Sequence, residues 1–225
     1  MVRQTCKCIL YVCCFLLVAC SSDIDGLEEE ERFPEEEIVE EIEEELDSGD
    51  NLLQNGDCES WWTMFTPYDF LNQWFCHNNY NVKQESKIVY EGKFSARMSA
   101  YKGETAIVNQ RIEVTPNHRL RIRFHYYIEE WKNNGARMYC YFRTTSTQNI
   151  SNTVLNEIYD KKTIKIIRGG GYGASFFPSE LGVWQTFDYT ITTPSIANYF
   201  VFEIHSYHET TIYIDDCCVV DMDME

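Results

Sequence analysis

The chain has 225 residues, enough for one ordinary domain with additional segments, and its aromatic content of 15% can supply a sizeable core. The formal charge of −17 is unevenly placed, because residues 23–50 hold 16 acids and one base, whereas the chain from Asn51 onward holds 20 acids and 16 bases. No basic patch large enough to hold a nucleic-acid backbone is evident in the sequence, which argues against nucleic acid as a partner.

The N-terminal segment, MVRQTCKCILYVCCFLLVAC, has a basic start and an apolar run from Ile9 to Ala19. That run is too short to span a bilayer but has the length of a signal-peptide core. Its end, Leu17-Val18-Ala19-Cys20, resembles the lipobox of bacterial lipoproteins, whose cysteine is diacylated after cleavage just before it. The resemblance implies a signal peptide over residues 1–19 and a lipid on Cys20 that holds the protein on a membrane. The alternative is an ordinary secretory signal that contains a cysteine.

Residues 20–50 follow as a tether dominated by glutamate. Like charges repel one another along such a segment, so we expect an extended spacer with a short helix at about 35–46, where apolar residues have helical spacing. An acidic stretch soon after the lipid-bearing cysteine resembles the surface-export signals of some Gram-negative lipoproteins. The resemblance implies an outer-membrane protein exposed at the cell surface. The alternative is that the segment is only a solvated stalk.

From Asn51 onward the hydrophobic pattern has a period of two, which predicts β-strands to the end of the chain. The predicted strands are 83–90, 93–100, 105–114, 120–128, 136–143, 184–191, 198–206 and 211–220. Turn signals such as Glu91-Gly92 and Asn133-Asn134-Gly135 separate them. Residues 144–181, with the glycine run that follows Arg168, are predicted to form a flexible loop. Many short antiparallel strands, each with one apolar face, predict an all-β, two-sheet sandwich over residues 51–225.

The same alternation predicts which side chains point into the sandwich. In 120–128 the inward set is Leu120, Ile122, Phe124, Tyr126 and Ile128, and the outward set is Arg121, Arg123, His125 and Tyr127. In 136–143 the inward set is Met138, Cys140 and Phe142, and the outward set is Arg137, Tyr139, Tyr141 and Arg143.

Several segments in this order resemble the galactose-binding-like jelly roll of many carbohydrate-binding modules. They are NLLQNGDCES from Asn51, Tyr90–Ser95, Asn109–Pro116, Arg119–Tyr127, Trp184 and Tyr213–Asp216. The resemblance covers residues 51–221 and implies that the first and last strands lie side by side. The chain departs from the family at Cys58, where a phenylalanine is usual, and in the long 144–181 insertion.

The resemblance also implies a structural Ca²⁺ near the Gly92-Lys93 turn, held by carboxylates and turn carbonyls. The expected ligands are Asp57, Glu59, Asp216 and the carbonyl of Lys93. Carboxylates that gather at one place repel one another unless a cation lies among them. The alternative is that these acids cap strand ends and accept hydrogen bonds from backbone amides.

Sugar binding requires aromatic rings for the apolar face of a pyranose and polar groups for its hydroxyls. One candidate patch is the outward row Arg137, Tyr139, Tyr141 and Arg143, joined by the outward set of 120–128. The other is the loop with Trp61, Trp62, Met64, Phe65 and Tyr68, with Trp131 nearby. The row could instead be covered by the 144–181 insertion or by the tether. Adjacent residues on an extended chain point opposite ways, so one of the two loop tryptophans is expected to be buried. Trp74 and Trp184 are expected in the core.

Five cysteines lie beyond the first 20 residues: Cys58, Cys76, Cys140, Cys217 and Cys218. None forms a C-x-x-C pair, so the sequence lacks the spacing of zinc and redox sites. We expect them to be small buried apolar side chains. The alternative is one disulfide, such as Cys58–Cys76, if the compartment is oxidising.

Catalytic motifs are not evident in the domain. Glycoside hydrolysis requires two carboxylates about 5–10 Å apart, and the outward candidates Glu203 with Asp188, or Glu129 with Glu130, are not paired by any motif. We therefore expect a non-catalytic, lipid-anchored module that captures a polysaccharide or glycoprotein glycan for surface enzymes or importers. Two alternatives stay open: a glycan-cleaving hydrolase or lyase on the same fold, and a structural or protein-interaction subunit of a surface complex.

Overall fold

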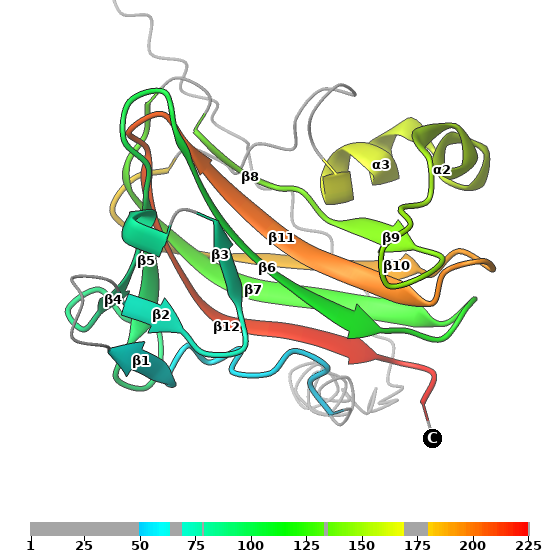
Figure 1. Ribbon diagram of the computed structural model, residues 1–225, viewed down its shortest axis with the longest axis horizontal. Helices are drawn as coiled ribbons and strands as arrows, with labels where there is room; N and C mark the ends of the chain where they lie inside the picture. Colours follow the sequence, from blue (N-terminus) through cyan, green and yellow to red (C-terminus); the bar gives the residue numbers. More distant parts are fainter. Residues whose placement is uncertain (1–49, 64–68, 78, 133–134, 169–179, 225) are drawn as a thin grey trace, which may run out of the picture.

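The structure is a computed structural model that describes residues 50–63, 69–77, 79–132, 135–168 and 180–224. Cys20, the tether with its predicted helix, Met64, Phe65 and Tyr68 lie outside these residues. Figure 1 shows two layers of strands, which confirms the all-β, two-sheet antiparallel sandwich. In the described residues no helix is long and apolar enough to cross a membrane.

The first sheet has the strand order β10-β7-β12-β5-β4, with neighbouring strands antiparallel. Its strands are β4 (Val82–Glu85), β5 (Ser95–Ser99), β7 (Arg119–Glu130), β10 (Trp184–Thr192) and β12 (Thr211–Asp221). β4 ends earlier than the predicted strand 83–90. The Glu85 carboxylate accepts hydrogen bonds from the amides of Ser86 and Lys87, and this local bonding replaces continued pairing with β5.

The second sheet has the order β3-β6-β11-β8, and β9 also pairs with β11. Its strands are β3 (Phe75–His77), β6 (Thr105–Glu113), β8 (Ala136–Met138), β9 (Tyr141–Arg143) and β11 (Tyr199–Tyr207). The predicted strand 136–143 is therefore divided in two. A small separate ribbon pairs β1 (Trp61–Thr63) with β2 (Asp69–Leu71), and a short 3-10 helix, η1 (Asn79–Asn81), precedes β4.

The core lies between the two sheets and follows the predicted alternation. All five inward residues of β7 are buried, as are Met138, Cys140 and Phe142. Phe124 of the first sheet meets Phe202 of the second edge-on, with ring centroids 5.6 Å apart. Edge-to-face contacts of this kind add to the hydrophobic stabilisation of the buried rings.

The two ends of the folded region lie side by side, as expected. The amide of Leu52 donates to the carbonyl of Val219 at 2.8 Å, and the amide of Cys217 donates to the carbonyl of Gly56 at 2.8 Å. Asn51 adds two side-chain hydrogen bonds to the same strand, one with Cys217 and one with Val219. The segment that begins the domain thus runs along β12.

Residues 144–181 are not only a loop, because they contain the helices α2 (Asn152–Ile158) and α3 (Lys161–Arg168). Leu155 and Ile164 are buried in the core, and the Tyr159 hydroxyl donates to the carbonyl of Thr192 at the end of β10. The helices lie beside β9 and β10 (Figure 1). They cover the core between the edges of the two sheets instead of lying over an outer face.

Candidate functional site

The outer face of the second sheet brings the predicted Arg–Tyr row together. Arg137, Tyr139, Tyr141 and Arg143 are each half-buried, on the opposite side from their buried neighbours. The register places Arg137 beside His205, Tyr141 beside Val201 and Arg143 beside Tyr199. Strand β6 continues these rows with Ile107, Asn109, Arg111 and Glu113. We call this surface the Arg–Tyr face.

A chain of hydrogen bonds fixes one end of the Arg–Tyr face. Arg137 Nε donates to the Tyr207 hydroxyl at 2.6 Å, which lies 2.6 Å from Nδ1 of His205. Nε2 of His205 lies 2.6 Å from Oε1 of Glu203. Every link is satisfied when Nε2 of His205 donates to Glu203 and Nδ1 accepts from the Tyr207 hydroxyl. Glu203 is only 8% exposed, so its carboxyl group depends on this chain of hydrogen bonds and not on water for a partner.

Aromatic rings and guanidinium groups stack over the same chain. The ring of Tyr139 stacks on His205 with centroids 5.0 Å apart. Arg137 lies over the rings of Tyr139 and Tyr207, at 5.1 and 4.7 Å from their centroids. Burial raises the pKa of Tyr207, so its phenol keeps the proton that the hydrogen bond requires.

The other end of the Arg–Tyr face has a second pair of cation–π contacts. Arg143 lies 5.1 Å from the ring centroid of Tyr141 and donates to its hydroxyl at 3.1 Å. Arg111 lies 5.4 Å from the ring centroid of Tyr199. Both arginines also donate through Nη1 to the carbonyl of Ser146, at 2.9 Å each. Burial raises the pKa of Tyr141 as well.

Sequence reasoning named Glu203 only as a candidate for hydrolysis, and it missed the other residues that β6, β11 and β3 bring to this face: Arg111, Tyr199, His205, Tyr207 and Phe75. The alternation in β11 could have placed Tyr199, Glu203, His205 and Tyr207 on one face. It could not have identified their neighbours, because the paired residues of β11 and β9 are more than 50 positions apart in the sequence. Phe75 is 61% exposed beside Asn109 and offers an uncovered aromatic ring.

The outward set of β7 does not join the Arg–Tyr face, contrary to expectation. Arg121, Arg123, His125 and Tyr127 belong to the first sheet and lie on the other side of the molecule. The prediction that Trp184 packs in the core is also wrong. Its partner in register is the outward-facing Tyr127, and it contacts the ring of Tyr90.

The first tryptophans lie on the separate β1–β2 ribbon. Trp61 packs against the core and its Nε1 donates to the carbonyl of Cys58 at 2.5 Å, whereas Trp62 is 56% exposed. One of the pair is thus largely covered, as expected. Trp131 packs over Gly135, and Trp74 is buried against Phe202 as predicted.

Among the carboxylates proposed for calcium, Glu59 lies against the backbone of the 90–94 turn, and Asp215, which was not among the proposed ligands, also bonds to it. Glu59 Oε1 accepts hydrogen bonds from the amides of Lys93 at 2.6 Å and Phe94 at 2.9 Å. Asp215 accepts from the amides of Tyr90, Glu91 and Asp216. Its burial raises its pKa to about 6, even though these amides favour the charged form.

The remaining predicted calcium ligands are placed differently. Asp57 is exposed and accepts a long bond from the amide of Glu59, and Asp216 lies 3.4 Å from Nε2 of His125. Within the described residues, no group of three or more His, Cys, Asp or Glu side chains could hold a metal ion. A calcium site at this turn would therefore depend on backbone carbonyls, such as that of Lys93, for most of its oxygen ligands.

The carboxylate pairs considered for hydrolysis are not arranged to flank a bond. Glu203 lies on the outer face of the second sheet and is bonded to His205, whereas Asp188 lies on the first sheet in an ion pair with Arg121. Glu129 accepts from the Tyr213 hydroxyl and Glu130 pairs with Lys132. All five cysteines of the domain are free thiols, so Cys58 and Cys76 are not joined.

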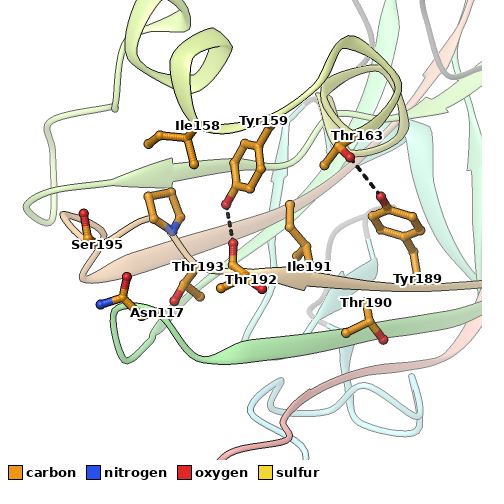
Figure 2. Close-up of a pocket in the computed structure, with 11 residues that line it drawn as sticks. Asn117, Ile158, Tyr159, Thr163, Tyr189, Thr190, Ile191, Thr192, Thr193 and Ser195 are labelled. Atoms are coloured by element: carbon orange, nitrogen blue, oxygen red, sulfur yellow. Dashed lines mark hydrogen bonds between the residues drawn. The ribbon is translucent and has the colours of Figure 1, made fainter.

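A pocket of about 490 Å³ lies where the helical insertion meets β10 (Figure 2). Tyr159 and Thr163 come from the insertion, and Tyr189 and the 190–195 segment form the opposite wall. The hydroxyls of Thr163 and Tyr189 are hydrogen-bonded to each other at 3.2 Å. The side chains that line this pocket are uncharged. No sequence pattern indicated the pocket.

No protein-family model matches this chain, and no curated protein matches it in sequence. Among solved structures, it is similar to a family 16 carbohydrate-binding module, with 16% identity and a TM-score of 0.50 over 76% of this chain and 100% of that one. It is also similar to the CBM22-1 xylan-binding domain from Paenibacillus barcinonensis, with 9% identity and a TM-score of 0.50 over 79% of this chain and 97% of that one.

The chain shares the β-sandwich fold of these modules. The same fold matches part of an enzyme: the enzymatically active domain of tailspike protein 4 from bacteriophage CBA120, with 11% identity and a TM-score of 0.51. That match covers 76% of this chain but 21% of the tailspike chain. At these identities the likeness concerns the fold, so the residues of the Arg–Tyr face must carry any argument about ligands.

Proposed function

We propose that the protein is a non-catalytic glycan-binding module that captures a polysaccharide or glycoprotein glycan at the cell surface. The observation that carries this proposal is the Arg–Tyr face, where four tyrosine rings and three arginines are held in fixed positions by hydrogen bonds and stacking. The fold shared with carbohydrate-binding modules supports it.

The binding mechanism follows from the layout of β11. His205 and Tyr199, which lie beside Arg137 and Arg143, are six residues apart, or roughly 20 Å along a strand. An extended oligosaccharide can lie along this length, with sugar rings against Tyr139, Tyr141 or Phe75 and hydroxyls against the guanidinium groups. Several weak contacts of this kind retain a polymer without cleaving it.

The attachment and the partners are part of the same proposal. A lipid on Cys20 would hold the protein on the outer membrane, and residues 20–50 would carry the domain away from it. A glycan retained there would be presented to surface enzymes or importers. We further propose a structural Ca²⁺ at the 90–94 turn, with Glu59, Asp216, Asp57 and the Lys93 carbonyl as its ligands.

The proposed function is tested by replacing the central rings. The double variant Tyr139→Ala and Tyr141→Ala should weaken retention of the full-length protein in glycan-containing gels about tenfold, because each ring contributes about 0.5–1.5 kcal/mol beyond its buried area. Tyr101→Ala is the matched control, since this ring is 64% exposed in the turn before β6. Undiminished retention in the double variant would contradict the proposed site and direct attention to Trp62.

A further inference from the structure

Three arginines on the first sheet are matched by carboxylates. Arg97 lies 3.8 Å from Glu129, Arg119 lies 2.5 Å from Asp223, and Arg121 lies 2.6 Å from Asp188. These charges are balanced within the protein, so that side of the molecule has little free positive charge to offer at these positions.

The arginines of the Arg–Tyr face are not matched in this way. In the described part of the chain, Arg111, Arg137 and Arg143 have no carboxylate within ion-pair distance, and their partners are phenol, carbonyl and amide oxygens and tyrosine rings. These arginines place positive charge on one face of a folded region whose own balance, 20 acids against 16 bases from Asn51 onward, is slightly negative.

Two of these arginines are drawn to the same atom. Nη1 of Arg111 and Nη1 of Arg143 each lie 2.9 Å from the carbonyl oxygen of Ser146. Two guanidinium groups that share one neutral acceptor repel each other, and an anion placed between them would remove that cost. The guanidinium fork suits a carboxylate or sulfate group because it can donate parallel hydrogen bonds to two of the group's oxygens.

The acidic side chains of this face do not neutralise the pair. Glu203 is hydrogen-bonded to His205 and is only 8% exposed. In the register of the sheet it lies beside Asn109, whereas Arg111 lies beside Val201. Glu113 lies at the end of β6 beside Tyr199 and is exposed to water. The third cation, Arg137, lies at the opposite end, with only its Nε bonded to a protein oxygen among the described residues.

We propose that the Arg–Tyr face takes an acidic polysaccharide, whose sugar rings carry carboxylate or sulfate groups. This inference rests on the proposed glycan-binding function and names the class of glycan. One anionic group lies between Arg111 and Arg143 and another reaches Arg137, roughly 20 Å away along β11. The intervening sugar rings lie over Tyr141 and Tyr139.

Matched pairs of polymers test the inference on the full-length protein in non-ionic detergent, by affinity electrophoresis. The carboxylate pair is polygalacturonate and its fully methyl-esterified form, and the sulfate pair is dextran sulfate and dextran. We expect retention by at least one acidic polymer to exceed that by its neutral partner about tenfold and to fall as salt is raised. Which acidic polymer is retained distinguishes carboxylate from sulfate.

Substitutions assign the effect to this face. Arg143→Gln and Arg137→Gln should each weaken retention by the acidic polymer about tenfold, because each removes a charged donor. Arg119→Gln makes the same change of charge on the first sheet and should leave retention unchanged. An equal loss in Arg119→Gln would mean general charge attraction and overturn the inference.

The remaining outcomes separate this inference from the proposed function. Retention by neutral xylan, galactan or mannan that equals or exceeds retention by the acidic polymers would overturn the acidic class while leaving glycan binding in place. Retention by no polymer, acidic or neutral, would overturn both.

Discussion

At the scale of single residues, side chains that face outward from β11 are buried by one another. Glu203, His205 and Tyr207 alternate along the strand and are joined by hydrogen bonds, and Tyr139 covers them from β8's end. Isolated outward side chains would be free to move between rotamers. Here each is fixed by its neighbours, so a ligand would find these groups already in place, with less conformational entropy to lose.

Glu59 offers a test of how the 90–94 turn is held. Its carboxylate accepts two backbone amides, and a Cβ on Gly92 would lie 2.3 Å from its Oε1, so the turn is closed directly over it. Glu59→Ala should lower the free energy of unfolding by about 1–2 kcal/mol, measured by urea denaturation, because two amides lose their acceptor. Asp57→Ala should stay within about 0.5 kcal/mol of the parent. Equal effects of the two variants would show that the Glu59 bonds do not stabilise the turn.

Calcium at the same turn makes a separate prediction. If Ca²⁺ binds the folded protein, chelation should lower the melting temperature, and added Ca²⁺ should restore it, because a ligand that binds only the native state stabilises it. Differential scanning calorimetry with and without EDTA measures this. A melt that is the same in both conditions counts against the metal, and Mg²⁺ serves as the control ion.

At the scale of elements, alternation predicted the faces of β7, β8 and β9 because each strand has one side in the core. It could not predict the sheet to which each strand belongs, and for that reason the outward sets of β7 and β9 were wrongly combined. Trp184 was misassigned for a related reason. A large aromatic residue was expected in the core, but the stacked rings of Tyr90 and His125 provide a partly covered place for it outside.

The helices α2 and α3 were missed because each has only seven or eight residues, and α3 contains three β-branched isoleucines that favour strands. Tertiary packing stabilises them instead. Ile164→Ala should lower the free energy of unfolding by about 2–4 kcal/mol, since its side chain is buried in the core. Ile158→Ala, at a 44% exposed position of α2, should change it by less than about 0.5 kcal/mol. Similar urea midpoints for both variants would mean that the insertion is not part of the cooperative core.

At the scale of the whole molecule, the proposed lipid anchor gives a clear expectation. Cys20→Ala removes the thiol that would be acylated, so the variant should move from the detergent phase to the aqueous phase in a phase-partitioning experiment. Cys13→Ala is the control, because it alters a cysteine of the same apolar segment. Continued partitioning of the Cys20 variant into detergent would refute the anchor.

The sequence predicted the closure of the fold well, because the resemblance placed the segment after Asn51 beside the last strand and the hydrogen bonds to Val219 and Cys217 agree. It could not predict the full Arg–Tyr face. Arg111 and Arg143 are 32 positions apart, and only the folded chain shows that they meet at one carbonyl.

The place where Asn51 joins β12 has a mechanical consequence for a tethered protein. A captured polymer would pull on the outer side of the second sheet, whereas the restraining force would enter at Asn51 and pass into the first sheet through Cys217 and Val219. The load would then cross the apolar layer where Phe124 meets Phe202. Resistance to drag would thus depend on how firmly the two sheets pack together. If the core between them were weakened, the second sheet would separate from the first before the ligand dissociated.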